Sequence, residues 1–96
     1  MLFAVIAKDK PGQIEVRKAN REAHLAFLEA LGDKVKLGGP LLDTSGESMT
    51  GSLLIIEAAS VADATSIMST DPYARAGLFQ SIEIRPWKWV VKAPEE

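Results

Sequence analysis

The sequence predicts an α+β fold in which two helices pack on one face of an antiparallel sheet. Four apolar runs with strand character occur in its 96 residues, and two helix-like segments separate them. The middle two runs flank a turn of hairpin length, so they are expected to pair side by side. A chain of this length holds one small hydrophobic core, and we expect a single domain over residues 1–96.

The first two elements are a strand and a helix. Leu2–Lys8 is an apolar run followed by Asp-Lys-Pro-Gly, which is typical of a buried strand that ends in a turn. The segment from Glu15 to about Asp33 has no proline and no glycine before Gly32, and it predicts one continuous helix. At about 100° per residue, one side of this helix is apolar. That side carries Val16, Ala19, Ala23, Phe27, Ala30 and Leu31.

Two strands follow as a predicted hairpin. They span Val35–Asp43 and Thr50–Ala58, and the turn between them begins Thr-Ser-Gly. The first of these strands contains Gly38, Gly39 and Pro40. Two residues without side chains inside a strand indicate either a β-bulge or a backbone that approaches a ligand closely, and the bulge is favoured.

The last third of the chain predicts a second helix, a short helix and a strand. Ser60 is a candidate N-cap for the second helix. Asp71 before Pro72 starts a short helix that Gly77 ends. Gln80–Val91 is a strand, and residues 92–96 are expected to be a frayed tail. The resulting order, β-α-β-β-α-β, is that of the ferredoxin-like unit.

Both faces of the sheet are predicted to be apolar. In Leu2–Lys8 and Thr50–Ala58 both alternating sets of side chains are apolar, yet two helices cover only one face. We therefore expect a homodimer whose sheets pack face to face. An alternative for the last strand is a bulge at Pro86 that exchanges its two faces, although this would not explain the other strands.

Composition excludes several classes of function. A net charge of −2 provides no basic face for nucleic acid, and no apolar run approaches the roughly 20 residues that span a bilayer. The N-terminal run lacks the basic region and cleavage site of a signal peptide, so we expect a cytoplasmic protein. With no cysteine and one histidine, disulfides, a cysteine nucleophile and a conventional zinc site are not expected, and neither is a cofactor.

His24 is the first candidate for chemistry because it is the one histidine of the chain. On the predicted helix, Arg17 and Arg21 share a stripe with His24 and Leu28. The arginines would hold a small carboxylate, and the imidazole would move a proton. The alternative is a solvated helix edge on which both arginines pair with nearby acids.

Asp71 is the candidate partner of His24. A carboxylate that accepts the Nδ1 proton fixes the tautomer and stabilises the imidazolium. An N-cap aspartate already accepts from backbone amides, but a carboxylate has acceptor sites for both roles. Tyr73 is either a pocket wall or an ordinary half-buried aromatic. Ser52 offers a hydroxyl to a ligand, with no motif for a nucleophilic serine around it.

Five segments together resemble the YciI-like (YCII-related) proteins of bacteria: "REAHLAFL", "GGPL", "TGSLLIIEA", "DPYARAGLF" and "IEIRPWKWV". The resemblance extends from Met1 to about Val91. It implies the dimeric α+β barrel fold, also found in muconolactone isomerases, and a His–Asp dyad formed by His24 and Asp71 near the dimer interface. The residues that it implies as the lining of the site are Arg21, Gly39, Pro40, Ser52 and Tyr73.

Two functions remain open from the sequence. The first is a cofactor-independent enzyme that isomerises, or eliminates from, a small anionic metabolite by acid–base chemistry at His24. The resemblance adds that an elimination of the dehydrochlorinase type is ascribed to part of the family, although fold and dyad fit several chemistries. The second is a dimeric module that binds a small ligand, or another protein, without turnover.

Overall fold

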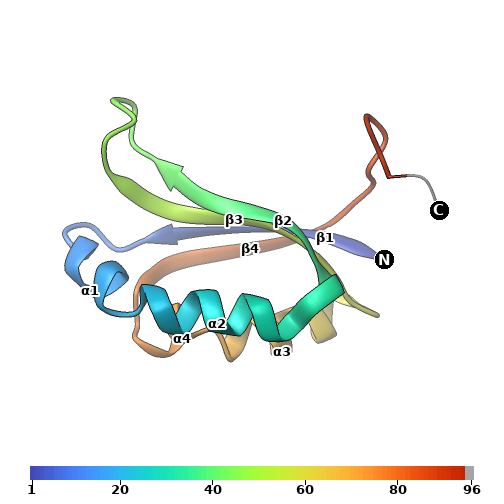
Figure 1. Ribbon diagram of the computed structural model, residues 1–96, viewed down its shortest axis with the longest axis horizontal. Helices are drawn as coiled ribbons and strands as arrows, with labels where there is room; N and C mark the ends of the chain where they lie inside the picture. Colours follow the sequence, from blue (N-terminus) through green and yellow to red (C-terminus); the bar gives the residue numbers. More distant parts are fainter. Residues whose placement is uncertain (95–96) are drawn as a thin grey trace.

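The computed structural model describes residues 1–94, and Figure 1 shows its ribbon. Four antiparallel strands form one sheet in the order β2-β3-β1-β4. The strands are β1 (Leu2–Asp9), β2 (Val35–Leu42), β3 (Met49–Glu57) and β4 (Phe79–Trp87). The predicted ferredoxin-like α+β arrangement is confirmed.

The helices lie on one face of the sheet, below the strands in Figure 1. They are α1 (Ile14–Ala19), α2 (Arg21–Leu31), the 3-10 turn η1 (Gly32–Lys34), α3 (Val61–Ser69) and α4 (Pro72–Arg75). Because every helix is on the same side, the opposite face of the sheet has no helical cover within residues 1–94.

The single helix predicted from Glu15 to about Asp33 is wrong, because the chain breaks at Asn20 into α1 and α2. The Asn20 side chain donates from Nδ2 to the carbonyl oxygen of Val16 at 2.9 Å. Asparagine competes in this way for backbone groups and disfavours a helix interior. Gly32, with φ of +58°, then ends α2.

The apolar side predicted for this segment is also only partly correct. Of its six residues, the three alanines are exposed and the other three are half-buried. The fully buried residues of α1 and α2 are instead Arg17 and His24. A buried arginine and a buried histidine therefore occupy positions where an ordinary amphipathic helix places apolar side chains.

The two predicted helix caps are confirmed. Ser60 Oγ accepts the backbone amide three residues further on at 3.1 Å, and α3 starts there. Asp71 accepts the amide of Tyr73 at 2.9 Å, with Pro72 at the first helical position of α4. Gly77, with φ of +72°, follows this short helix and leads the chain into β4.

The predicted β2–β3 hairpin is confirmed, but the bulge expected at Gly38–Pro40 is wrong. The pairing of β2 with β3 runs through these residues without a shift, and irregularities occur nearer the ends of β2. Gly38 has a different reason to be glycine, since a Cβ there would overlap the side chain of Leu54. The small residue lets the backbone of β2 lie close to β3.

The strand predicted over Gln80–Val91 ends earlier, at Trp87. Trp87 pairs with Leu2, the first residue of β1, so no residue of β1 remains opposite residues 88–91. Residues 88–94 form neither helix nor strand. Of the tail expected to fray, residues 95–96 lie outside the described residues.

The main core lies between the sheet and the helices. Its buried residues come from β1, β3 and α3, and all are aliphatic or aromatic except for one methionine. They are Phe3, Val5, Leu54, Ile56, Ala64 and Met68. This layer fixes the helices against the centre of the sheet.

The opposite face of the sheet is apolar over β1 and β3, as both strand patterns predicted, while Glu83 and Arg85 of β4 also lie on it. Leu37, Leu53 and Trp87 are 43%, 36% and 36% exposed, and they lie on three different strands. The bulge considered at Pro86 is wrong, since β4 pairs with β1 through this residue without a shift.

Within residues 1–94, none of the helices combines the length and the apolar character that crossing a membrane requires.

Candidate functional site

A cavity of about 200 Å³ lies between α1 and α2 on one side and β2 and β3 on the other. Its polar lining comes from four elements, α1, α2, β3 and α4. These residues are Arg17, Arg21, His24, Ser52 and Tyr73. The rest of the lining is apolar or backbone: Leu25, Leu28, Gly38, Gly39, Pro40, Met49 and Leu54.

Seven of the eight site residues expected from the sequence line this one cavity. The eighth, Asp71, lies behind His24 and is fully buried. Three lining residues that the sequence did not single out are Leu25, Met49 and Leu54. Their apolar character is that of ordinary core residues, so no signal in the sequence separates them from the core.

His24 and Asp71 are in contact although they are 47 positions apart in the chain. His24 Nδ1 lies 2.9 Å from Asp71 Oδ1, and the same oxygen accepts the Tyr73 amide at 2.9 Å. An oxygen that already receives one N–H is an acceptor, so His24 donates to it from Nδ1. This tautomer leaves the lone pair of Nε2 available to a ligand.

The second oxygen of Asp71 has a different environment. Oδ2 is buried and has no hydrogen-bond partner among residues 1–94. Both identified contacts of the carboxylate therefore fall on Oδ1, which combines the cap of α4 with the contact to the imidazole. The two interpretations of Asp71 left open by the sequence, helix cap and histidine partner, are compatible in the folded chain.

Tyr73 forms one wall of the site and is 2% exposed. Its ring stacks on the imidazole of His24 with centroids 4.0 Å apart, and the guanidinium of Arg17 lies 4.5 Å from its centroid. Burial raises the pKa of the Tyr73 hydroxyl, and the nearby Asp71 charge adds to this, while the Arg17 charge opposes it. Tyr73 is thus a tightly packed aromatic at the base of the cavity.

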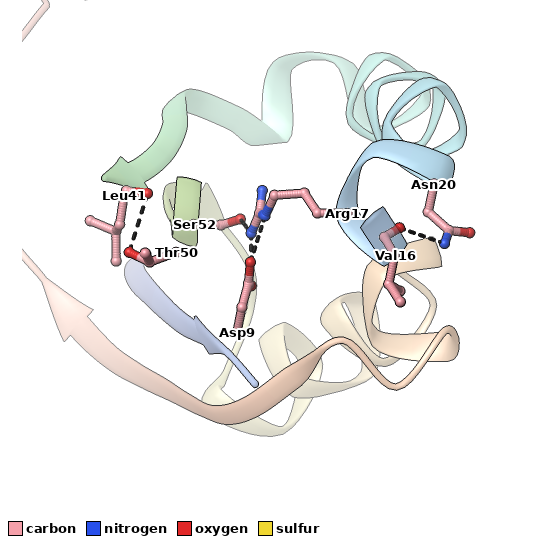
Figure 2. Close-up of polar contacts among 7 residues, drawn as sticks. All are labelled: Asp9, Val16, Arg17, Asn20, Leu41, Thr50 and Ser52. Carbon is pink, nitrogen blue, oxygen red and sulfur yellow. Dashed lines mark hydrogen bonds and ion pairs between the residues drawn. The ribbon is translucent and has the colours of Figure 1, made fainter. Parts of the chain in front are cut away.

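Arg17 makes a buried ion pair that the sequence analysis missed. Its Nε and Nη2 donate to the two oxygens of Asp9 at 2.7 and 2.9 Å, and Nη2 also donates to Ser52 Oγ at 2.9 Å. Figure 2 shows the Arg17 side chain reaching from α1 to Asp9 on β1 and Ser52 on β3. Burial alone lowers the pKa of Arg17, but the hydrogen bonds and charge of Asp9 outweigh it and raise that pKa.

The sequence predicts Asp9 only as the start of a turn, but the alternation of β1 contains a signal for its burial. Phe3, Val5 and Ala7 share its parity and all face the helices. An acidic residue at the next position of that series has to find a buried cationic partner. Arg17, eight positions later, is that partner.

The two arginines consequently have different roles in the cavity. The charge of Arg17 is already balanced by Asp9, so the sequence-based expectation that Arg17 holds a ligand carboxylate loses its basis. Arg21 is exposed, lines the cavity and makes no ion pair with any residue in the described range 1–94. It is the cationic group of this site that remains available to an anion.

No metal site accompanies these residues: over positions 1–94, no three or more histidine, aspartate or glutamate side chains gather closely enough to hold an ion. The chemistry available at the cavity is that of an imidazole, a serine hydroxyl and a cation. These groups suit proton transfer and the binding of a small anion.

The fold and the site define a small ferredoxin-like α+β protein with a ligand-sized cavity beneath its first two helices. The sequence matches the YCII-related domain over residues 1–88, and the chain belongs to that family. Protein YciI of Escherichia coli O6:H1 is 35% identical over 94% of this chain and 99% of its own length. An uncharacterised protein of Haemophilus influenzae is 32% identical over the same shares.

Solved structures agree with this placement. A 5-chloro-2-hydroxyhydroquinone dehydrochlorinase from Burkholderia phenoliruptrix AC1100, in complex with 2,5-dihydroxybenzoquinone, has a TM-score of 0.84 and 44% identity. The alignment covers 92% of this chain and 94% of that one. A NIPSNAP family protein from Agrobacterium tumefaciens has a TM-score of 0.58 at 18% identity, covering 99% and 97% of the two chains. The latter shares the fold alone.

Replacing Asp9 with alanine is expected to lower the free energy of unfolding by about 3–5 kcal/mol, because it leaves the buried Arg17 without a counter-charge. Urea denaturation followed by circular dichroism measures this. The matched control is Glu83→Ala, which removes an exposed pair with Arg85 at 3.3 Å and is expected to cost about 0–1 kcal/mol. Equal effects of the two substitutions would contradict a stabilising role for the buried pair.

Tyr73 predicts a stability change at alkaline pH. In the unfolded chain the phenol ionises near its ordinary value of 10.0, while the folded protein keeps the proton to higher pH. Above pH 10 the folded state therefore binds more protons, and the free energy of unfolding falls as pH rises towards the pKa of the folded form. Since Tyr73 is the one tyrosine of the chain, phenolate absorbance reports it alone.

The control for this prediction is Tyr73→Phe, which retains the ring but has no ionisable hydroxyl. The part of the alkaline destabilisation that is due to Tyr73 should be absent from this variant, while the part due to lysines remains. A wild-type absorbance change centred at or below pH 10 would contradict the expected protection of the phenol.

Proposed function

We propose that this protein is a small-molecule enzyme in which His24 transfers protons and Asp71 positions its imidazole. The observation that carries the proposal is the 2.9 Å contact from His24 Nδ1 to Asp71 Oδ1 beside a cavity of about 200 Å³. With Nδ1 held by the carboxylate, Nε2 is the nitrogen that meets the ligand. A cavity of this size suits a small metabolite, and the exposed Arg21 favours an anionic one.

The proposed reaction is an isomerisation or an elimination. His24 Nε2 accepts a proton from a carbon next to a carbonyl group, and the electrons of the broken C–H bond move onto the carbonyl oxygen as an enolate. In an isomerisation the imidazolium returns the proton at a different carbon. In an elimination the enolate electrons form a new double bond and the leaving group departs with its electron pair.

Each charged group has a stated part in this reaction. The Asp71 carboxylate stabilises the imidazolium that forms during proton transfer, and Arg21 neutralises a substrate carboxylate or the developing enolate. The steps use protein side chains and the substrate alone. Pro40 and the backbone of Gly39 form the wall opposite the helices and limit the size of what binds.

Similarity to the dehydrochlorinase supports the elimination in particular. That enzyme acts on a chlorinated, hydroxylated single ring, and its structure contains 2,5-dihydroxybenzoquinone. A single oxygenated ring fits the size and polarity proposed for the ligand of this cavity. We therefore propose 5-chloro-2-hydroxyhydroquinone as the first compound to test. Its keto tautomer provides the carbonyl group that the elimination needs, loss of HCl leaves the hydroxyquinone, and chloride release is the measured product.

His24→Asn is expected to lower kcat for chloride release by roughly 10²–10⁴-fold, because it removes the group that accepts the proton. The Kd for 2,5-dihydroxybenzoquinone, measured by calorimetry, should change by less than about tenfold, since one neutral hydrogen bond contributes little to the binding free energy. The matched control is Glu22→Gln, an exposed neighbour on α2. Binding without chloride release by the wild type would instead support the alternative, a module that binds small ligands.

Asp71→Ser separates the two roles of Asp71. Serine still caps α4, but its shorter side chain does not reach the imidazole. Its expected result is a lower kcat together with loss of the Nδ1–H tautomer in ¹⁵N NMR spectra of the single histidine. A variant that retained the tautomer and turnover of the wild type would show that Asp71 is a helix cap only.

We further propose that the chain forms a homodimer through the sheet face opposite the helices. That face holds Leu53 on the interior strand β3, with Leu37 and Trp87 on the two edge strands, and each of the three is at least 36% exposed. Apolar area of this kind is stabilised by burial against a second apolar surface, and an identical sheet provides one. The cytoplasmic location expected from the sequence stays a prediction.

Leu53→Lys is expected to convert the dimer to a monomer, because it places a charge within this face. Sedimentation velocity at micromolar concentration distinguishes the two masses. Val61→Lys is the control, since Val61 is 46% exposed but lies on α3 on the other side of the sheet. A wild-type protein that sediments as a monomer would overturn the proposed dimer.

A further inference from the structure

Ser52 is a polar residue of the cavity whose hydroxyl group has one hydrogen-bond partner, Arg17. Its side chain lies on β3, is 4% exposed and lines the cavity. Ser52 Oγ accepts a hydrogen bond from Arg17 Nη2 at 2.9 Å. In the described part of the chain the hydroxyl donates to no acceptor, so a buried O–H group is left with its hydrogen unused.

The direction of this hydrogen follows from the chemistry of Arg17. A guanidinium has donors and no acceptor, so Ser52 can only accept from it and its own hydrogen points away. Both oxygens of Asp9 clamp the guanidinium, which prevents it from turning aside. The strand neighbours of Ser52, Ala7 and Pro40, have no side-chain acceptor. The hydroxyl hydrogen is therefore free to turn towards the cavity that Ser52 lines.

We infer that Ser52 donates this hydrogen bond to an oxygen atom of the substrate, and that Arg17 and Asp9 are its positioning residues. The inference rests on the proposed function in one respect, namely that His24 is the group that accepts the proton. With a proton acceptor at Nε2 and a hydroxyl donor at Ser52, the substrate class is a small oxo or phenolic compound. Its oxygen gains negative charge as a proton leaves a nearby carbon.

The same arrangement explains why a buried arginine is useful at this position. Arg17 polarises the Ser52 hydroxyl and strengthens it as a donor, since linked hydrogen bonds reinforce one another. Asp9 cancels the charge of Arg17, so the interior carries a fixed donor without an uncompensated cation. A donor that is already oriented stabilises a developing oxyanion without reorganisation during the reaction.

The test uses 4-nitrophenol as the probe, because its absorbance reports whether its oxygen is ionised. Bound to the wild type, it is expected to ionise at a lower pH than in solution. Ser52→Ala should weaken binding of the phenolate by roughly ten- to a hundredfold, the effect of one hydrogen bond to a charged group. Nitrobenzene, which lacks the phenolic oxygen, should bind both proteins within about twofold of each other.

A second pair of variants guards against misfolding. Ser52→Thr and Ser52→Val have nearly the same shape and both suit a strand, but only threonine has a hydroxyl. Threonine should retain the preference for the phenolate, and valine should lose it. Arg17→Lys should give an intermediate loss, because lysine keeps the charge but not the two-point contact with Asp9.

Each outcome decides the inference. Equal phenolate binding by the wild type, the alanine variant and the valine variant would overturn it, as would a parallel loss of nitrobenzene affinity. The probe has no C–H bond next to a carbonyl group for His24 to break, so the result does not depend on turnover. Failure of the proposed function therefore appears in the chloride assay of His24→Asn, and failure of the Ser52 donor appears in the phenolate measurement.

Discussion

The buried pair of Arg17 and Asp9 is the interaction on which the site depends. An arginine enclosed under α1 is stable only where a carboxylate balances its charge and accepts its hydrogen bonds, and Asp9 at the end of β1 provides both. The pair ties the first helix to β1, one of the two interior strands of the sheet. From that fixed position the guanidinium contacts the ring of Tyr73 and orients the hydroxyl of Ser52.

Asp71 performs the corresponding task on the other side of the cavity. One oxygen caps α4 and accepts from His24 on α2, so the same oxygen that starts a four-residue helix also fixes the tautomer of the imidazole. Tyr73, within α4, packs between the two halves of the site by contacting His24 and Arg17. Polar residues therefore occupy the interior in connected pairs, which is the arrangement that makes their burial tolerable.

The same four strands contribute to the core, to the apolar face opposite the helices and to the wall of the cavity. Side chains of alternate residues in β1 and β3 fill the core, and the residues between them form the second apolar face. The cavity occurs where β2 has Gly38, Gly39 and Pro40, which form its wall opposite α2. The requirement at Gly38 is steric, because Leu54 occupies the place of its missing Cβ.

Local signals in the sequence were sufficient for the order of the elements and for both helix caps. Ser60 and Asp71 cap helices through amides two or three positions away, and a contact of that range depends on adjacent residues alone. The stripe through His24 also identified the part of the cavity lining that α1 and α2 share, because residues three and four apart on a helix share a face. Where local signals fit more than one conformation, at Asn20 and at Gly38–Pro40, the sequence-based prediction was wrong.

Tertiary structure decided which polar groups meet. The contact between His24 and Asp71 joins residues 47 positions apart, and Arg17 reaches Ser52 across 35 positions. No periodicity or spacing encodes such contacts, since they arise only when the sheet and the helices pack and place distant side chains in one enclosed space. The sequence by itself therefore determined the elements and the candidate residues. The packing determined that Asp9 neutralises Arg17, because a buried charge takes whichever partner the fold brings within hydrogen-bond distance.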